Sequence, residues 1–323
     1  MAYTQASSLS TDQAAYDRLA YFALRSELLF DAAADVQATN QSMPGSSVVF
    51  TIFNDLDAAT DTLAETTDVT PVAMGDSQVT VTLAEYGNAV NTTAKVRGTS
   101  FLDVDAVAAN VIGYNAGISI DSVVRDVLAA GTNVVYGSGG ASLPTSRATV
   151  GSDDIIKAND VRKVVAALRA ANSVTFNGMY MGYMHPDVSY DLRRETGAAS
   201  WRDPHVYVDT ANIYNGEIGA FESVRFIETP RAKVFANASD GSGSSTGSSA
   251  TVDVYCTHIM GRQALAKAHS IVDGNGAFPR VVRGPIVDAL ERFHPMGWYW
   301  LGGYGRFREA SLRRIEAASS IGS

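Results

Sequence analysis

Two short segments with strand periodicity are joined by a long polar connection, and this arrangement most constrains the fold. Residues 48–53 are rich in valine, isoleucine and phenylalanine, and residues 78–83 alternate between apolar and polar side chains. Both patterns predict β-strands. The connection between them, residues 54–77, is rich in threonine and aspartate and contains one proline and one glycine. Because strands inside a compact core are joined by shorter loops, the sequence predicts an arm that extends from a body.

The arm lies in a strongly acidic part of the chain. Residues 26–94 contain no lysine or arginine but ten acids, and five of the acids lie in the connection ahead of its proline: Asp55, Asp57, Asp61, Glu65 and Asp68. The last 44 residues carry seven arginines against four acids. Acidic and basic sections on one chain favour contacts between unlike surfaces of two copies, which close into rings or shells. From charge alone, the acidic stretch could equally be a solvated surface that contacts no other copy.

Composition excludes several classes of protein. With 323 residues, 46% apolar and 18% charged, the chain is expected to be a folded globular protein with one large or two modest domains. Its net charge of −9 argues against a nucleic-acid-binding surface. Cys256 is the only cysteine, so neither an internal disulfide framework nor a cysteine-rich zinc site is expected. No apolar run reaches the length of a membrane span, and the polar first ten residues do not resemble a secretory signal.

Two segments have the periodicity of amphipathic helices. The first, Asp12–Val36, follows Thr11 as a capping residue and carries apolar side chains along one side at Tyr16, Leu19, Ala20, Ala23 and Phe30. The second covers residues 100–131 and ends at a glycine. Gly113 and Gly117 allow a bend within it. At 1.5 Å per residue, this second helix would be about 40 Å long and would cross the molecule as a strut.

The rest of the chain alternates between helical and strand patterns. The predicted elements are, in order, a linker at 137–149, a helix at 161–171, a strand at 179–184, a short helix after Pro186, strands at 224–227 and 251–260, and a strand-like aromatic section at 281–317. The glycine- and serine-rich residues 241–249 predict a surface loop. Such alternation is typical of a mixed α/β domain and predicts one for this second part of the chain.

The motifs on which enzymes depend are missing from the sequence. There is no Gly-x-Ser-x-Gly nucleophile elbow, no phosphate-binding loop and no His-Glu-x-x-His zinc motif. The glycine-rich residues 137–140 lack the dinucleotide-binding fingerprint. We therefore predict no catalytic residue, no cofactor and no metal site.

Three weaker patterns have simpler structural explanations. Cys256 and His258 share one strand face and could bind a metal, but a half-buried strand position explains them more simply. The sequence His185-Pro186-Asp187 fits a strand-to-helix turn, with proline early in the helix, better than a catalytic dyad. The aromatic residues 298–300 could stack a sugar or a base, but they are more typical of core or interface packing.

Three sequence motifs, taken in order, point to one family. They are Met184–Arg193 (Met-His-Pro-Asp-Val-Ser-Tyr-Asp-Leu-Arg), Gly216–Gly219 followed by Val224–Thr229, and Gly297–Trp300 followed by Arg314–Glu316. In these motifs the chain resembles the major capsid proteins of tailed double-stranded-DNA bacteriophages, and more narrowly the branch typified by coliphage N-four. The order of predicted elements agrees with this resemblance over nearly the whole chain.

The resemblance implies an α+β protein with the Hong Kong 97-type (HK-97-type) capsid fold. By position, its parts would be an N-terminal arm at 1–46, an E-loop at 47–97, a peripheral domain with a long spine helix at 98–149, an α/β axial domain at 150–276, and C-terminal strands returning to the peripheral domain at 277–323. Such a structural, non-enzymatic protein would self-assemble as hexamers and pentamers. The product would be the icosahedral capsid of a virion, enclosing double-stranded DNA and assembled in the bacterial host cytoplasm.

The resemblance also implies a role for the uneven distribution of charge. The acids of the E-loop would meet arginines on the peripheral domain of a neighbouring subunit, for which the candidates are Arg280, Arg283, Arg306, Arg308, Arg313 and Arg314. Each exposed pair contributes about 0–1 kcal/mol, and a shell repeats the contact many times. Some relatives join an E-loop lysine covalently to a neighbour's asparagine. Residues 47–94 contain no lysine, so this cross-link is not expected.

Several partners follow from the same resemblance. An N-terminal arm of 46 residues is too short to contain a fused scaffolding segment, so a scaffold would be a separate protein. Portal and decoration proteins are further possible partners, the DNA would be enclosed without sequence-specific binding, and no membrane contact is expected. Two alternatives remain at this point: an encapsulin-type nanocompartment, which uses the same fold to enclose a cargo enzyme, and an unrelated α/β hydrolase or binding enzyme.

Overall fold

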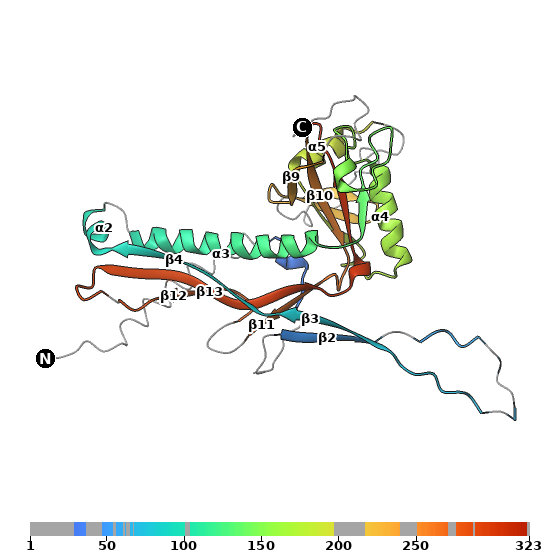
Figure 1. The fold of residues 1–323 in the computed structure, drawn as a ribbon, viewed down its shortest axis with the longest axis horizontal. Coiled ribbons are helices and arrows are strands. Elements are labelled where there is room, and N and C mark those ends of the chain that lie inside the picture. The colour runs from blue at the N-terminus through green and yellow to red at the C-terminus, as the bar shows by residue number, and fades with distance from the viewer. Residues whose placement is uncertain are drawn as a thin grey trace.

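The computed structural model describes residues 29–36, 47–53, 56–60, 62, 65–66, 68–100, 104–196, 217–239, 251–270, 276–286 and 288–321. These residues form a lower domain built on a five-stranded sheet, an upper domain built on a seven-stranded sheet, and a hairpin that projects from the lower domain (Figure 1). A long helix runs along the lower domain and ends where the upper domain begins (Figure 1).

The lower domain is organised around one long strand, β13 (Phe293–Arg306). β13 pairs with β4 (Ala84–Thr93) along one edge. On its other edge it pairs with β12 (Arg280–Arg283) and β11 (Leu265–His269), and β11 also pairs with the short β1 (Asp35–Val36). α2 (Ala94–Thr99) leads from β4 to the long helix α3 (Val104–Ala129).

Helix α3 covers one face of this sheet. Its buried apolar side chains are small or aliphatic, and they pack in one core with Trp298 and Trp300 of β13. The indole Nε1 of Trp298 donates a 2.8 Å hydrogen bond to Asn115 of α3. The helix is continuous through Gly113 and Gly117, both buried, so the sequence prediction of a long strut is confirmed. Its 26 residues correspond to about 39 Å at 1.5 Å per residue.

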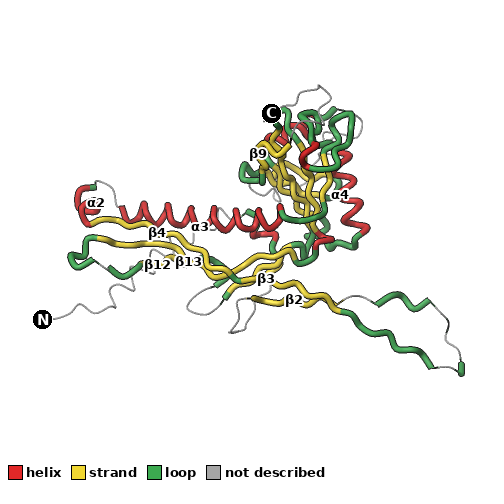
Figure 2. Tube along the Cα trace, in the orientation of Figure 1, coloured by secondary structure: helices red, strands yellow, loops and turns green. Residues whose placement is uncertain are grey.

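The upper domain contains a mixed sheet with two helices. The strands lie in the order β5-β14-β10-β6-β8-β7, and β9 pairs with β10. The bounds are β5 (Val134–Tyr136), α4 (Ala158–Ala170), β6 (Tyr180–Met184), α5 (Pro186–Arg194), β7 (Glu217–Phe221), β8 (Val224–Glu228), β9 (Val234–Ser239), β10 (Val252–Met260) and β14 (Leu312–Ala317). Figure 2 shows these strands as a layer with α4 along one side.

The arm predicted from the sequence is a two-stranded hairpin. β2 (Ser47–Phe53) pairs antiparallel with β3 (Asp76–Thr82), in a register from Ser47–Thr82 to Phe53–Asp76. Beyond this pair the described residues of the connection extend away from both domains (Figures 1 and 2). The prediction of two strands joined by a long projecting segment is therefore confirmed.

The N-terminal helix prediction needs a correction at its C-terminal end. Residues 12–28 lie outside the described residues, but Asp31–Ala33 is a single 3-10 turn, η1, and Asp35–Val36 is strand β1. The helix therefore does not continue to Val36. The cause is a set of long-range contacts: β1 is in register with Ala266–Lys267 of β11, and the Asp31 carboxylate binds Lys267.

The remaining predictions are confirmed in type, with several omissions and one difference. The sequence analysis did not predict β4, α2, β5, β7, β9 or β11. The last strand, β14, lies in the seven-stranded sheet, whereas β12 and β13 lie in the sheet beneath α3. β14 therefore departs from the expectation that residues 277–323 all return to the domain of the long helix. The predicted loop at 241–249 lies outside the described residues.

Candidate assembly surfaces

The root of the arm, which is the paired part of β2 and β3, packs against the lower domain. Phe50 and Val81 are 4% and 1% exposed, and they pack against Ala266 and Ala268 of β11. Two glycines of β13 make this close approach possible. A Cβ atom at Gly303 would lie 2.2 Å from the carbonyl oxygen of Thr82, and one at Gly305 would lie 2.7 Å from a methyl group of Val81. The glycine-rich end of β13 is therefore the surface on which the root of the arm packs, and we call this surface the seat of the arm.

The distal part of the arm is both apolar and acidic. Its exposed apolar side chains are Leu56 (57% exposed), Val69 (56%), Val72 (76%) and Met74 (69%). Asp57, Glu65 and Asp68 are exposed among them, whereas Asp55 and Asp61 lie outside the described residues. None of the ion pairs found among the described residues involves Asp57, Glu65 or Asp68. Apolar side chains grouped on the distal part of the arm, where they are more than half exposed, indicate a surface for another molecule.

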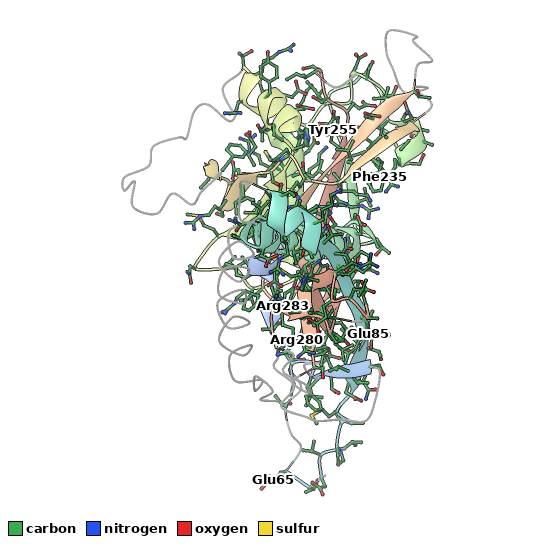
Figure 3. The ribbon with its side chains drawn as sticks, turned by 90° about the vertical axis from the view of Figure 1, so that its left-hand side faces the viewer. Glu65, Glu85, Phe235, Tyr255, Arg280 and Arg283 are labelled. Carbon is green, nitrogen blue, oxygen red and sulfur yellow. The ribbon has the colours of Figure 1, made fainter. Side chains whose placement is uncertain are left out.

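Two of the candidate arginines lie on β12 of the lower domain. Arg280 is half-buried, and its guanidinium lies 5.7 Å from the ring centre of Tyr299. No acidic partner of Arg280 is found in the part of the chain that the structure describes, and its Nε makes no hydrogen bond there. Arg283 lies three residues further along the same strand. Figure 3 shows both arginines on the lower domain, with Glu65 far from them at the end of the arm.

Arg280 also lines a groove on the face of the sheet opposite α3. The groove has a volume of about 870 Å³, and its lining comes from β4, β12, β13, Ser270 and Gly284. Tyr299 and Leu301 provide its apolar lining on β13, and Glu85 contributes an acid from β4. This face of the lower domain is therefore concave and largely apolar, with one cation beside it.

The next two candidates, Arg306 and Arg308, are used within the subunit. The Nε atom of Arg306 lies 2.8 Å from a carboxylate oxygen of Glu309, and its Nη1 donates to the carbonyl of Val127. Arg308 donates to the carbonyls of Ala171 and Asn172, just beyond the end of α4. Both arginines therefore tie the junction between β13 and β14 to the ends of helices.

The last two candidates, Arg313 and Arg314, belong to the upper domain. Arg314 is 9% exposed, bonds to the carbonyl of Ala129 and lies 2.9 Å from the carboxylate of Glu316. Arg147 also binds this buried carboxylate, at 2.6 and 2.9 Å. Arg313 is half-buried on the same strand. The six arginines are therefore not gathered in one patch, and only Arg280 lines the groove.

The weaker chemical patterns are explained by packing. His185 is the N-cap of α5, its Nδ1 accepts the backbone N–H of Asp187, and Pro186 is the first helical residue. The predicted strand-to-helix turn is confirmed. Trp298 and Trp300 lie in the core beneath α3, which confirms the packing interpretation of the aromatic cluster.

Cys256 and His258 lie deeper than predicted. They are fully buried rather than half-buried, with Sγ 3.4 Å from Nε2. Burial raises the pKa of the Cys256 thiol to about 12 and lowers the pKa of His258 to about 3. Both side chains are therefore neutral near pH 7. Among the described residues, no cluster of three or more His, Cys, Asp or Glu side chains could hold a metal ion, and no helix is long and apolar enough to cross a membrane.

A body of two sheets, a long helix and a projecting hairpin defines a subunit with surfaces for neighbours rather than a pocket for a reaction. The family model described as "Phage capsid protein" matches residues 5–321, and the chain belongs to this family. The protein is therefore a structural, non-enzymatic capsid protein of a phage virion, present there in multiple copies. The nanocompartment and enzyme alternatives are not favoured.

Solved structures support the same fold. The chain is similar to the capsid of Ralstonia phage GP4, with a TM-score of 0.70 and 15% identity over 92% of this chain and 91% of that one. It is also similar to the capsid of cyanophage Pam1, with a TM-score of 0.63 and 15% identity over 88% of each chain. For the head of Helicobacter pylori bacteriophage KHP40 the TM-score is 0.63, with 12% identity over 90% of this chain and 88% of that one.

These likenesses confirm the predicted Hong Kong 97-type fold. Among curated proteins, none matches the chain in sequence. The narrower resemblance to the coliphage N-four branch stays a prediction.

Proposed function

We propose that the chain is the repeating subunit of hexamers and pentamers that tile an icosahedral shell around packaged double-stranded DNA. In this proposal residues 1–46 are the N-terminal arm, 47–97 the E-loop, 98–149 the peripheral domain and 150–276 the axial domain. Residues 277–323 provide the C-terminal strands, of which β12 and β13 belong with the peripheral domain. Assembly takes place in the host cytoplasm, with separate scaffolding, portal and decoration proteins as partners. The DNA is held without sequence-specific contacts.

The observation that carries this proposal is the arm. Its root is buried on β11 and β13, while its distal part exposes Leu56, Val69, Val72 and Met74 to solvent. These exposed side chains belong to none of the hydrophobic core clusters found among the described residues, so their burial does not stabilise the isolated subunit. A neighbouring subunit would cover them. The arm therefore supports assembly through a contact between unlike surfaces, which can repeat around a ring and across a shell.

The partner surface in this proposal is the grooved face of the neighbour's lower domain. Tyr299 and Leu301 provide apolar area for the distal part of the arm. Arg280 provides positive charge opposite the acids Asp57, Glu65 and Asp68, whereas Arg283, in register with the buried Met296, lies on the other face of β12 and has no part in the groove. Arg306, Arg308 and Arg314 have partners within the subunit, and Arg313 lies on the upper domain, so these four have no part in this contact.

Magnitudes indicate which part of the contact provides affinity. Full burial of one valine, leucine or methionine side chain contributes about 1.5–3 kcal/mol, whereas one exposed ion pair contributes about 0–1 kcal/mol. The apolar side chains therefore provide most of the affinity of the proposed contact. The charged side chains chiefly set orientation and register during association.

The proposed contact is non-covalent. Residues 47–94 contain no lysine, so the arm has no amine with which to form a cross-link to a neighbour's asparagine. The only cysteine is buried. Particles boiled in detergent should therefore run as a single band near 34 kDa with or without reductant. A ladder of multimers would show that covalent bonds join the subunits.

Removal of the distal arm tests the proposal. Residues 54–75 would be replaced by Asn-Gly, which closes a two-residue hairpin and keeps the register of β2 and β3. Wild-type protein, expressed with its scaffold where it needs one, should form closed shells visible by electron microscopy. The shortened variant should remain as unassembled subunits with unchanged circular dichroism. Normal shells from the shortened variant would refute the role proposed for the arm.

A further inference from the structure

Helix α3 carries an apolar stripe that no described part of the subunit covers. Val107, Val111 and Tyr114 are 50%, 56% and 50% exposed. Their i, i+4, i+7 spacing places them along one face of the helix, away from the sheet that buries the opposite face. Isolated exposed apolar residues are ordinary, but three in one line on a helix indicate that another element packs there.

The same face is covered further along the helix. One heptad beyond Tyr114 lies Asp121, which is buried and pairs with Arg231 at 3.2 Å. Arg231 also donates a 3.0 Å hydrogen bond to the carbonyl of Ile118. The upper domain therefore covers the C-terminal half of this face, and the stripe is the part that remains bare.

The N-terminal segment of the chain meets α3 at the boundary between the covered and bare halves. The Asp121 carboxylate accepts the backbone N–H groups of Leu29 and Phe30, at 3.2 and 3.1 Å. The hydroxyl group of Tyr183, in the upper domain, donates a 3.0 Å hydrogen bond to the carbonyl of Leu29. The described chain therefore begins directly beside the end of the stripe.

The residues that precede Leu29 fit the stripe in pattern and in length. The sequence predicts a helix from Asp12, with Tyr16, Leu19, Ala20 and Ala23 along one side. This i, i+3, i+4, i+7 pattern matches the spacing of the stripe. Residues 12–28 as a helix would measure about 25 Å, and the distance along α3 from Asp121 to Val107 is about 21 Å.

We propose that residues 12–28 of the same chain pack on this stripe as a helix parallel to α3. The hydrogen bonds from Leu29 and Phe30 to Asp121 anchor the end of the segment on α3. Because α3 runs from Val107 towards Asp121, a segment that ends at Leu29 lies parallel to it. The anchor also sets the register, which places Ala23 near Tyr114, Leu19 near Val111 and Tyr16 near Val107. A small side chain would then face the largest one of the stripe.

A disulfide pair tests this proposal in dilute, unassembled subunits. The variant Ala23→Cys with Tyr114→Cys should oxidise within its own chain and give a faster-migrating monomer on a non-reducing gel. The matched control is Arg25→Cys with Tyr114→Cys, because Arg25 lies on the opposite side of the predicted helix. We expect oxidation at least tenfold faster in the first variant. The native Cys256 is 1% exposed and does not compete.

Two outcomes would overturn the proposal. A band of dimer size would show that the segment of a second copy covers the stripe, and equal rates in both variants would show that the segment does not pack there. As a second measurement, Val111→Asp should raise amide hydrogen exchange of residues 12–28 at least tenfold while exchange within α3 stays unchanged. Unchanged exchange in residues 12–28 would also contradict the proposal.

Discussion

Lys267 Nζ lies 2.8 Å from the Asp31 carboxylate, and their side chains are only 2% and 9% exposed. Tyr304 donates a 2.7 Å hydrogen bond to the same carboxylate. The pair joins β11 to the N-terminal segment across 236 positions of sequence. Loss of one partner from a buried ion pair leaves a charge without compensation, which typically costs about 3–5 kcal/mol.

Asp31→Asn should therefore lower the free energy of unfolding by about 3–5 kcal/mol, because it keeps the shape of the side chain but leaves the Lys267 ammonium unpaired. Urea unfolding of the unassembled subunit measures this change. Asp57→Asn, on the exposed arm, is the control and should change stability by less than about 0.5 kcal/mol. Equal effects of the two substitutions would mean that the buried pair does not hold the N-terminal segment in place.

Gly303→Ala should disturb the root of the arm. The added Cβ would lie 2.2 Å from the Thr82 carbonyl oxygen, so β3 would have to move away from β13. We expect a loss of about 1–3 kcal/mol, together with a lower yield of shells in electron micrographs. Gly98→Ala is the matched control, because a Cβ at Gly98 has nothing within 4 Å and lies in helix α2. A variant at Gly303 that assembles as well as the Gly98 variant would contradict the proposed seat.

Stability should fall between pH 7 and pH 5 because of His258. Burial lowers its folded-state pKa to about 3, whereas the unfolded chain has the ordinary value near 6.5. Between these values the unfolded state binds more protons, so acidification favours unfolding. From pH 7 to pH 5 the loss from this group is about 2 kcal/mol.

The variant His258→Gln stays neutral and should lose this part of the pH dependence. Urea unfolding of the unassembled subunit at the two pH values measures the difference. Ile259→Val on the same strand should lower stability by about 0.5–1.5 kcal/mol at both values and keep the wild-type pH dependence. If His258→Gln keeps the wild-type difference, His258 is not the group that titrates.

The sequence was sufficient for the elements whose burial is periodic. The arm strands and α3 each bury side chains in a regular pattern that local sequence displays. β4 was missed because most of its ten residues are exposed and polar, and its strand geometry comes from pairing with β13 about 210 positions later. β11 was missed because a lysine in the sequence indicates an exposed position. Lys267 is buried only because the folded chain pairs it with Asp31.

The candidate charged surface was only partly predictable for the same physical reason. Local sequence identified the arm and its acids. It could not distinguish Arg280, which has no acidic partner among the described residues, from Arg314, whose partner Glu316 is buried in the other sheet. The partners of Arg306 and Arg308 include carbonyls at the ends of α3 and α4, which only the folded chain brings near.

Reversal of charge on the arm tests whether its acids face a basic surface. Replacement of Asp57, Glu65 and Asp68 by lysine should reduce assembly, most strongly at low ionic strength, where screening is weakest. Circular dichroism should not change, because these side chains are exposed. Addition of Arg280→Glu should restore part of the shell yield, because the charges are then exchanged across the contact. Normal assembly of the triple variant at low salt would mean that the acids are only a solvated surface.

The most direct measurement of the central claim is single-particle electron cryomicroscopy of the assembled wild-type protein. The account predicts a closed shell of hexamers and pentamers. In the map, the distal part of each arm should lie on a neighbour's lower domain, with Val72 and Met74 covered and Arg280 facing the acids. Arms that extend into solvent or fold back on their own subunit, or a protein that stays monomeric even with its scaffold, would contradict it.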